Sequence, residues 1–182
     1  MLKLKIALVF FLPLFAFSQN EKWPAEKLKQ DLTIFKEIRE KANSGLYKYR
    51  TKQQIDSIYS WAFSQINTPK SLIEFYKIVL QITDFEGSLH NDTTLPEDFE
   101  KKYSSGNIFF PFPVKLINGQ LILNFENTQI PLGSQIYSIN GIETSKLLST
   151  VYKYYTTDGY NIKGKSIGIG SSFAKYFEME YG

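Results

Sequence analysis

Apolar residues in the first half of the chain recur at helical spacing. They fall every three or four positions over 25–42, which predicts a first helix. The stretch 51–54, Thr-Lys-Gln-Gln, has the pattern of a capping box and predicts a second helix that stops at Asn67. Thr68 followed by Pro69 predicts the start of a third helix. Three helices with short connections predict a small helical domain.

The pattern changes after Gly87. Residues 88–105 are mostly polar, contain Pro96 and end in a Ser-Ser-Gly break. Such a stretch is typical of an exposed connection between domains. We therefore predict that the helical domain covers residues 19–102.

The next part of the chain has the pattern of β-structure. Strands are predicted over 108–112 and 114–117, and the run VKLI-NG-QLIL predicts a hairpin. Its Asn118-Gly119 pair supplies the two positive φ angles of a type I′ turn. The chain has therefore become rich in β-strands by this point.

A strand, a turn and a helix follow the hairpin. The strand is predicted over 136–139, between Gly133 and the Asn140-Gly141 turn, and the helix over 145–155. The last stretch, 163–182, begins with spaced glycines that predict a flexible connection. Its last residues, SSFAKYFEMEYG, have the pattern of the start of another element, for which the sequence provides no packing partner.

Composition is that of a folded, exported protein. The chain has 182 residues, 43% of them hydrophobic and 16% aromatic, which is enough to build a core. Lys3 and Lys5 precede an apolar run over 6–17 and a small-residue site, so residues 1–18 are predicted to be a cleaved signal peptide. The alternative is a membrane anchor, but this run spans roughly 18 Å as a helix, against a hydrocarbon core of ~30 Å. A periplasmic or extracellular location is expected.

Charge and cysteine content remove several classes of partner. Without Lys3 and Lys5 the chain has 19 basic and 18 acidic residues, so nothing in it attracts nucleic acid. The absence of cysteine excludes disulfides and a lipid-anchored N-terminus. After signal cleavage, no association with a membrane is expected.

Candidate chemistry is sparse. The one histidine, His90, lies in a polar stretch with Asp92 nearby, and this pair is too small for a metal site. No nucleophile elbow, S-x-x-K motif or phosphate-binding loop occurs. We assign no catalytic residue, no metal ligand and no cofactor.

The order of the motifs resembles a known family. A helical segment is followed by DFEGSLHNDTTLP, P-x-x-V-K-L-I-N-G-Q and IPLGSQIYSING, as in the N-terminal half of secreted tail-specific (C-terminal-processing) serine peptidases. The G-S-x-I-x-S-I-N-G stretch is similar to the G-D-x-I-x-x-I-N-G of PDZ-like domains, with Ser134 in place of the aspartate. His90 resembles the histidine of a D-G-H-T stretch, but Asn91-Asp92 intervene and no role is carried over. The resemblance implies that the catalytic serine and lysine lie in a later α/β domain.

The predicted fold is therefore α+β. A three-helix domain is followed by a PDZ-like domain over 103–162 with one groove helix, and 163–182 begins a further, truncated catalytic domain. PDZ-like modules bind a peptide as an extra strand beside a groove helix. This implies peptide contacts at Leu148 and Tyr152, which could equally be core residues, and at Gly133 and Ser134.

Two functions remain open from the sequence. One is the substrate-recognition half of a secreted serine peptidase, which binds polypeptide substrates or protein C-termini. The other is a stand-alone, non-catalytic extracytoplasmic peptide-binding protein.

Overall fold

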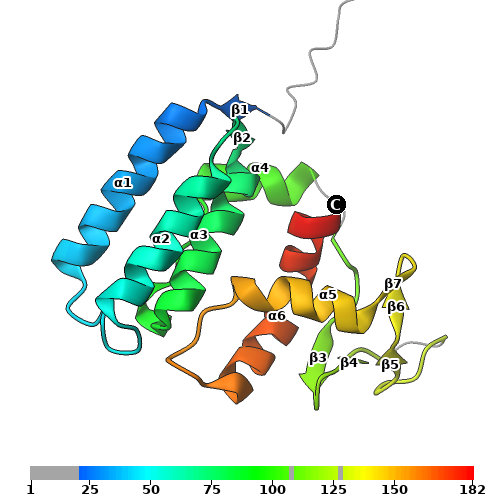
Figure 1. The fold of residues 1–182 in the computed structure, drawn as a ribbon. Helices are drawn as coiled ribbons and strands as arrows, with labels where there is room; N and C mark the ends of the chain where they lie inside the picture. Colours follow the sequence, from blue (N-terminus) through cyan, green and yellow to red (C-terminus); the bar gives the residue numbers. More distant parts are fainter. Residues whose placement is uncertain (1–20, 107–108, 127–128) are drawn as a thin grey trace, which may run out of the picture.

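The structure, a computed structural model, has the predicted α+β class (Figure 1). It describes residues 21–106, 109–126 and 129–182, so the predicted signal peptide lies outside the described residues. The described part contains six α-helices and small antiparallel sheets. None of its helices is long and apolar enough to cross a membrane.

The first helices follow the predictions closely. Helix α1 covers Ala25–Ala42 and α2 covers Lys52–Gln65. The predicted capping box is confirmed, because Thr51 accepts a hydrogen bond from the Gln54 amide at 3.2 Å and donates its own amide to the Gln54 side chain at 2.9 Å.

The predicted start of the third helix is wrong by a few residues. Strand β2, Lys70–Ser71, pairs with β1, Lys22–Trp23, and α3 covers Leu72–Glu86. Helix α3 has its own capping box, in which the Ser71 hydroxyl accepts from the Glu74 amide and the Glu74 carboxylate accepts from the Ser71 amide. This second box, rather than the Thr68-Pro69 pair, sets the helix start.

Two predictions between the helices and the hairpin are also wrong. The expected exposed connection contains a short 3₁₀ turn, Leu89–Asn91, and helix α4, Glu97–Gly106. The acidic first turn of α4 suits a helix N-terminus, and Tyr103 is the residue of α4 that is buried. Residues 109–112 form no strand, and Ile108 lies outside the described residues.

The hairpin is confirmed. Strand β3, Val114–Ile117, pairs with β4, Gln120–Leu123, through Asn118 and Gly119, whose φ angles are 49° and 78°. Strand β5, Gln135–Ile136, pairs with the other side of β4 and completes a sheet in the order β3-β4-β5.

The strand predicted over 136–139 is divided at Tyr137. Its second part is β6, Ser138–Ile139, which forms a separate hairpin with β7, Ile142–Glu143. Helix α5, Thr144–Val151, follows and ends in a 3₁₀ turn over Tyr152–Tyr154, earlier than the predicted residue 155.

The prediction of a flexible, unpartnered C-terminal stretch is wrong. Residues Ile162–Tyr181 form one continuous helix, α6, which packs against β3 and α5. The glycines serve close packing, because a Cβ on Gly168 would lie 1.8 Å from the Tyr155 ring and one on Gly170 would lie 3.2 Å from the Leu116 nitrogen.

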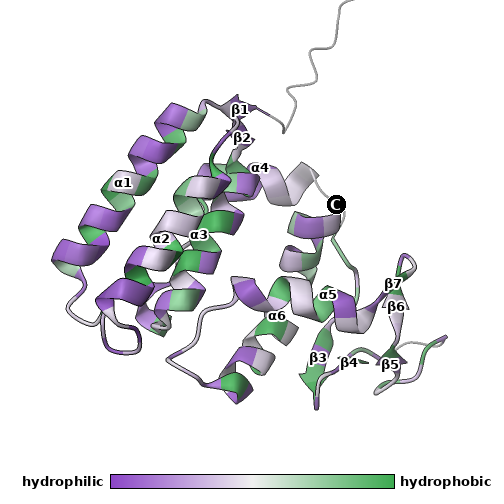
Figure 2. Ribbon diagram, viewed as in Figure 1, coloured by the Kyte–Doolittle hydropathy of each residue, from purple (hydrophilic) through white to green (hydrophobic). Residues whose placement is uncertain are grey.

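Buried apolar residues form two clusters that share α3, a helix along which Figure 2 shows hydrophobic residues. One cluster lies among α1, α2 and one side of α3. The other joins the opposite side of α3 to α4, the sheet, α5 and α6. The predicted domain boundary after residue 102 falls inside α4, between elements of this second cluster.

Candidate functional site

An open, largely apolar groove of about 370 Å³ lies beside β5. One of its lining residues is Phe110, whose ring packs edge-on against Phe173 of α6 at 5.6 Å between centroids. Phe110 also contacts Phe112, so the core positions both rings. The side chains that line the groove are Phe110, Phe112, Leu123, Ile130, Ser134, Gln135, Ile136, Tyr137, Ser138 and Ile139.

The outer edge of β5 runs along this groove. The Leu123 amide donates to the Ser134 carbonyl at 2.9 Å, so this carbonyl points toward β4, while the Ser134 amide donates to the Pro131 carbonyl. Because backbone polar groups alternate in direction along a strand, the N–H and C=O of Gln135 face away from β4. In the described part of the chain no strand pairs with that side of β5. The groove thus offers a strand edge beside apolar walls.

Turns at both ends hold β5 in place. Gly133, with φ 86°, donates its amide to the Leu123 carbonyl at 3.0 Å and starts the return of the chain along β4. A positive φ of this kind favours glycine. At the other end, Thr144 donates its amide to the Tyr137 carbonyl at 2.9 Å and its hydroxyl to the Ile136 carbonyl at 2.6 Å.

The residues predicted to contact peptide separate in the structure. Ser134 lines the groove, and Gly133 forms the turn next to it. Leu148 is only 7% exposed and belongs to the core cluster around α6. Tyr152 directly follows α5 and packs against the same cluster, with its hydroxyl 3.3 Å from the Ser166 hydroxyl and its ring beneath the Lys165 ammonium. Leu148 therefore takes the alternative role named above, that of a core residue.

Helix α6 covers the outer edge of β3. The Asn124 amide donates to the Pro113 carbonyl, so the polar groups of residues 114 and 116 face away from β4. Gly170 lies against the Val114 oxygen and the Leu116 nitrogen on that side, and α6 also contacts α5. Figure 1 shows α6 on one side of β3 and β4 on the other. The edge of β3 is therefore covered, and that of β5 is not.

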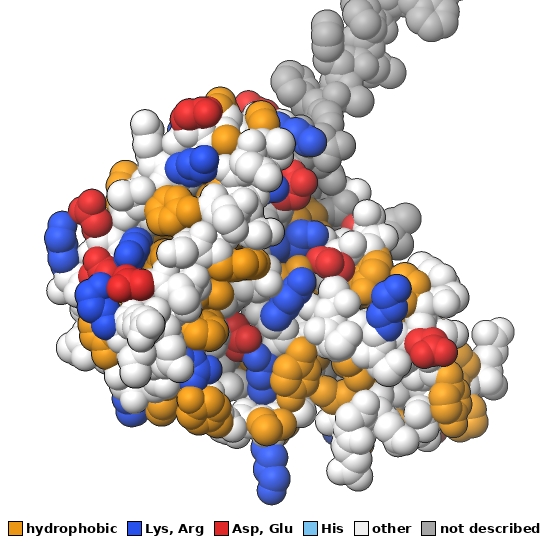
Figure 3. All heavy atoms as spheres, viewed as in Figure 1, with side chains coloured by type: hydrophobic (Ala, Val, Ile, Leu, Met, Phe, Trp, Pro, Cys, Tyr) orange, Lys and Arg blue, Asp and Glu red, His pale blue; other side chains and the backbone are white. Residues whose placement is uncertain are grey.

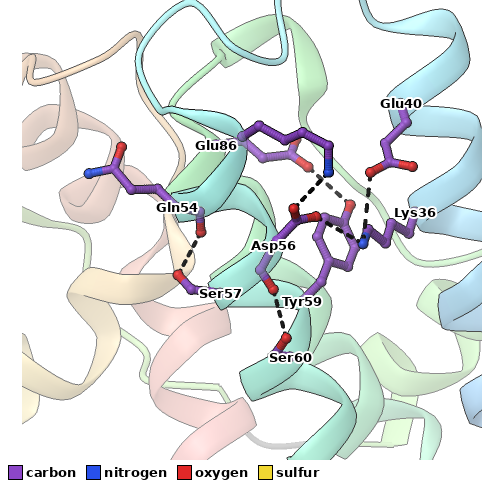
Figure 4. Close-up of polar contacts among 9 residues, drawn as sticks. Lys36, Glu40, Gln54, Asp56, Ser57, Tyr59, Ser60 and Glu86 are labelled. Carbon is purple, nitrogen blue, oxygen red and sulfur yellow. Dashed lines mark hydrogen bonds and ion pairs between the residues drawn. The ribbon is translucent and has the colours of Figure 1, made fainter.

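A buried charge cluster lies on the opposite part of the molecule, at the end of α3. Glu86 pairs with Arg39 at 2.8 Å and accepts a hydrogen bond from the Tyr59 hydroxyl at 3.1 Å. Figure 4 shows the Tyr59 and Glu86 side chains pointing toward each other, with Lys36 reaching Asp56 nearby. Burial raises the pKa of Glu86, while Arg39 and Tyr59 act against this rise. All its members hold elements together, so we assign it a structural role.

A second ion pair, at the start of α6, also serves packing. Lys165 contacts both carboxylate oxygens of Asp84 on α3, at 2.5 and 2.6 Å. Burial raises the pKa of Asp84, and the Lys165 ammonium opposes that rise. His90 is exposed in the 3₁₀ turn, and no group of three potential metal ligands occurs among the described residues.

Sequence reasoning missed most of the groove. It placed one wall on the helix predicted over 145–155, whereas the residues that line the groove include Phe110 and Phe112, which precede the hairpin. The available signal was the run FFPFP at 109–113, in which prolines interrupt strand pairing while the aromatic side chains stay together.

Comparisons with known proteins add no identification. No protein-family model matches this chain, and no curated protein matches it.

Proposed function

We propose that this chain is the substrate-recognition half of a secreted tail-specific serine peptidase, with the catalytic serine and lysine outside it. In this proposal the region around β3 to α5 is a PDZ-like module, which binds an extended polypeptide by strand addition. The sequence resemblance supports the family. The outer edge of β5, beside an apolar groove, is the observation that carries the activity.

The surface of this half of the molecule is consistent with such a role. Figure 3 shows acidic and basic side chains close together over α1, and hydrophobic side chains exposed on both halves of the molecule. Tyr137, which lines the groove, is 73% exposed. An exposed aromatic residue next to a strand edge provides contact area for an incoming peptide.

Substitution of Gln135 tests strand addition directly. Gln135→Pro removes the outward N–H and leaves the hydrogen bond from the Leu123 amide to the Ser134 carbonyl intact, since proline is tolerated on the open side of an edge strand. We expect the affinity for a fluorescently labelled Val- and Leu-rich peptide to fall about tenfold, through one lost main-chain bond and steric exclusion at the edge. Fluorescence anisotropy measures this change.

Gln135→Ala is the matched control, because it changes the same side chain and keeps the N–H. It should bind the peptide as the wild type does, and both variants should unfold near the wild-type midpoint. Equal affinity of Gln135→Pro and wild type would show that the β5 edge does not bind the peptide.

A further inference from the structure

The groove beside β5 is lined by uncharged side chains. None of the described residues that line it is acidic or basic. Its polar side chains, Ser134, Gln135 and Ser138, lie at the strand, while Phe110, Leu123 and Ile136 form apolar walls. A carboxylate transferred from water to such walls loses its hydration without gaining a cation.

The turn that precedes β5 offers few amides to an anion. Carboxylate recognition by a loop requires several N–H groups that point outward together. Here Pro131 has no N–H, the Gly133 amide donates to Leu123, and the Ser134 amide donates to the Pro131 carbonyl at 3.2 Å. The Gly133 and Ser134 amides are thus engaged within the protein and are not free to form a cradle.

We propose that the groove binds an internal, uncharged and apolar segment of an unfolded polypeptide, and that it does not recognise a free C-terminal carboxylate. This inference rests on the proposed function and specifies its substrate. Because the side chains that line the groove are uncharged, an uncharged apolar segment can enter it without losing the hydration of an ion. The outward N–H and C=O of Gln135 bind main chain, which an internal segment supplies on both sides of the contact.

Three labelled peptides with one Val- and Leu-rich sequence test this proposal on the whole chain. The first ends in a free carboxylate, the second in an amide, and the third continues into further Gly and Ser residues. We expect all three to bind with dissociation constants within about twofold of one another, since no contact depends on the terminal charge. A tenfold preference for the free carboxylate would overturn the proposal.

A groove variant gives an independent measurement. Ser134→Lys places an ammonium group beside the turn, where the wild type has none among the lining residues. We expect this variant to prefer the free carboxylate over the amide by about fivefold, in line with a partly exposed ion pair. A wild type with the same preference would contradict the proposal. Failure of every peptide to bind would overturn the proposed function itself, which separates the two results.

Discussion

At the scale of single residues, Glu86 has the most unusual surroundings. Its side chain is 1% exposed, and its two partners, Arg39 and Tyr59, come from α1 and α2. One carboxylate therefore connects three helices. Burial nevertheless raises its pKa above the ordinary value of 4.5, because the lost hydration outweighs what the partners return.

The raised pKa of Glu86 predicts how stability depends on pH. As the pH rises through 4.5, the unfolded chain loses this proton before the folded chain does, so the free energy of unfolding falls until the pH passes the folded pKa. Glu86→Gln removes this contribution and keeps a hydrogen-bonding side chain. We expect the difference in unfolding free energy to shift in favour of the variant as the pH rises across this window, measured by urea denaturation at a series of pH values.

Glu37 provides the matched control for this series. It pairs with Lys41 on the exposed face of α1, where both side chains are more than half exposed. Glu37→Gln should change stability little at any pH, as expected for a surface ion pair. If the difference between Glu86→Gln and wild type did not vary with pH, Glu86 would have an ordinary pKa in the folded chain.

At the scale of elements, local patterns predicted the structure where neighbouring residues decide it. The Thr51 capping box and the Asn118-Gly119 turn satisfy their hydrogen bonds or φ angles within a few residues, and both were predicted correctly. The glycines of α6 show the opposite case. Gly168 and Gly170 lower helix propensity, yet the helix continues through both positions. The absence of their side chains lets Tyr155 and β3 pack closely against the helix.

The same reasoning explains what was missed at the candidate site. Which edge of the sheet is open depends on where α6 packs, and that is a contact between residues far apart in the chain. The motif was enough to identify Ser134. Helical spacing placed Leu148 on the apolar face of its helix, but it could not tell whether that face is buried or contacts a peptide. Peptide binding itself stays a prediction.

A larger residue at Gly170 tests the packing of α6 on β3. Gly170→Leu would drive its side chain into the Leu116 nitrogen and the Val114 oxygen, both of them backbone atoms that cannot turn aside. We expect a loss of about 2 kcal/mol in the free energy of unfolding, typical of overpacking, despite the better helix propensity of leucine. Ser171→Leu, on the adjacent exposed position of α6, should change stability by much less. Equal effects would show that α6 does not approach β3 this closely.

At the scale of the whole molecule, α3 belongs to both apolar clusters. Ile78 and Ile82 face α1 and α2, while Tyr76 and Leu80 face the cluster that contains α6. Loss of either cluster exposes one side of the same helix. The helical half and the sheet half are therefore expected to unfold together rather than as independent domains.

The two tryptophans make this coupling measurable, because Trp23 and Trp61 both pack against the cluster of α1 and α2. Phe173→Ala removes a ring that is 1% exposed in the other cluster, at an expected cost of about 4 kcal/mol. We expect the transition detected by tryptophan fluorescence to move to lower denaturant by the same amount as the transition detected by far-UV circular dichroism. Phe125→Ala, at an exposed ring, should leave both nearly unchanged. A fluorescence transition unaffected by Phe173→Ala would mean that α3 does not couple the two clusters, and that the boundary predicted after residue 102 separates independent folding units.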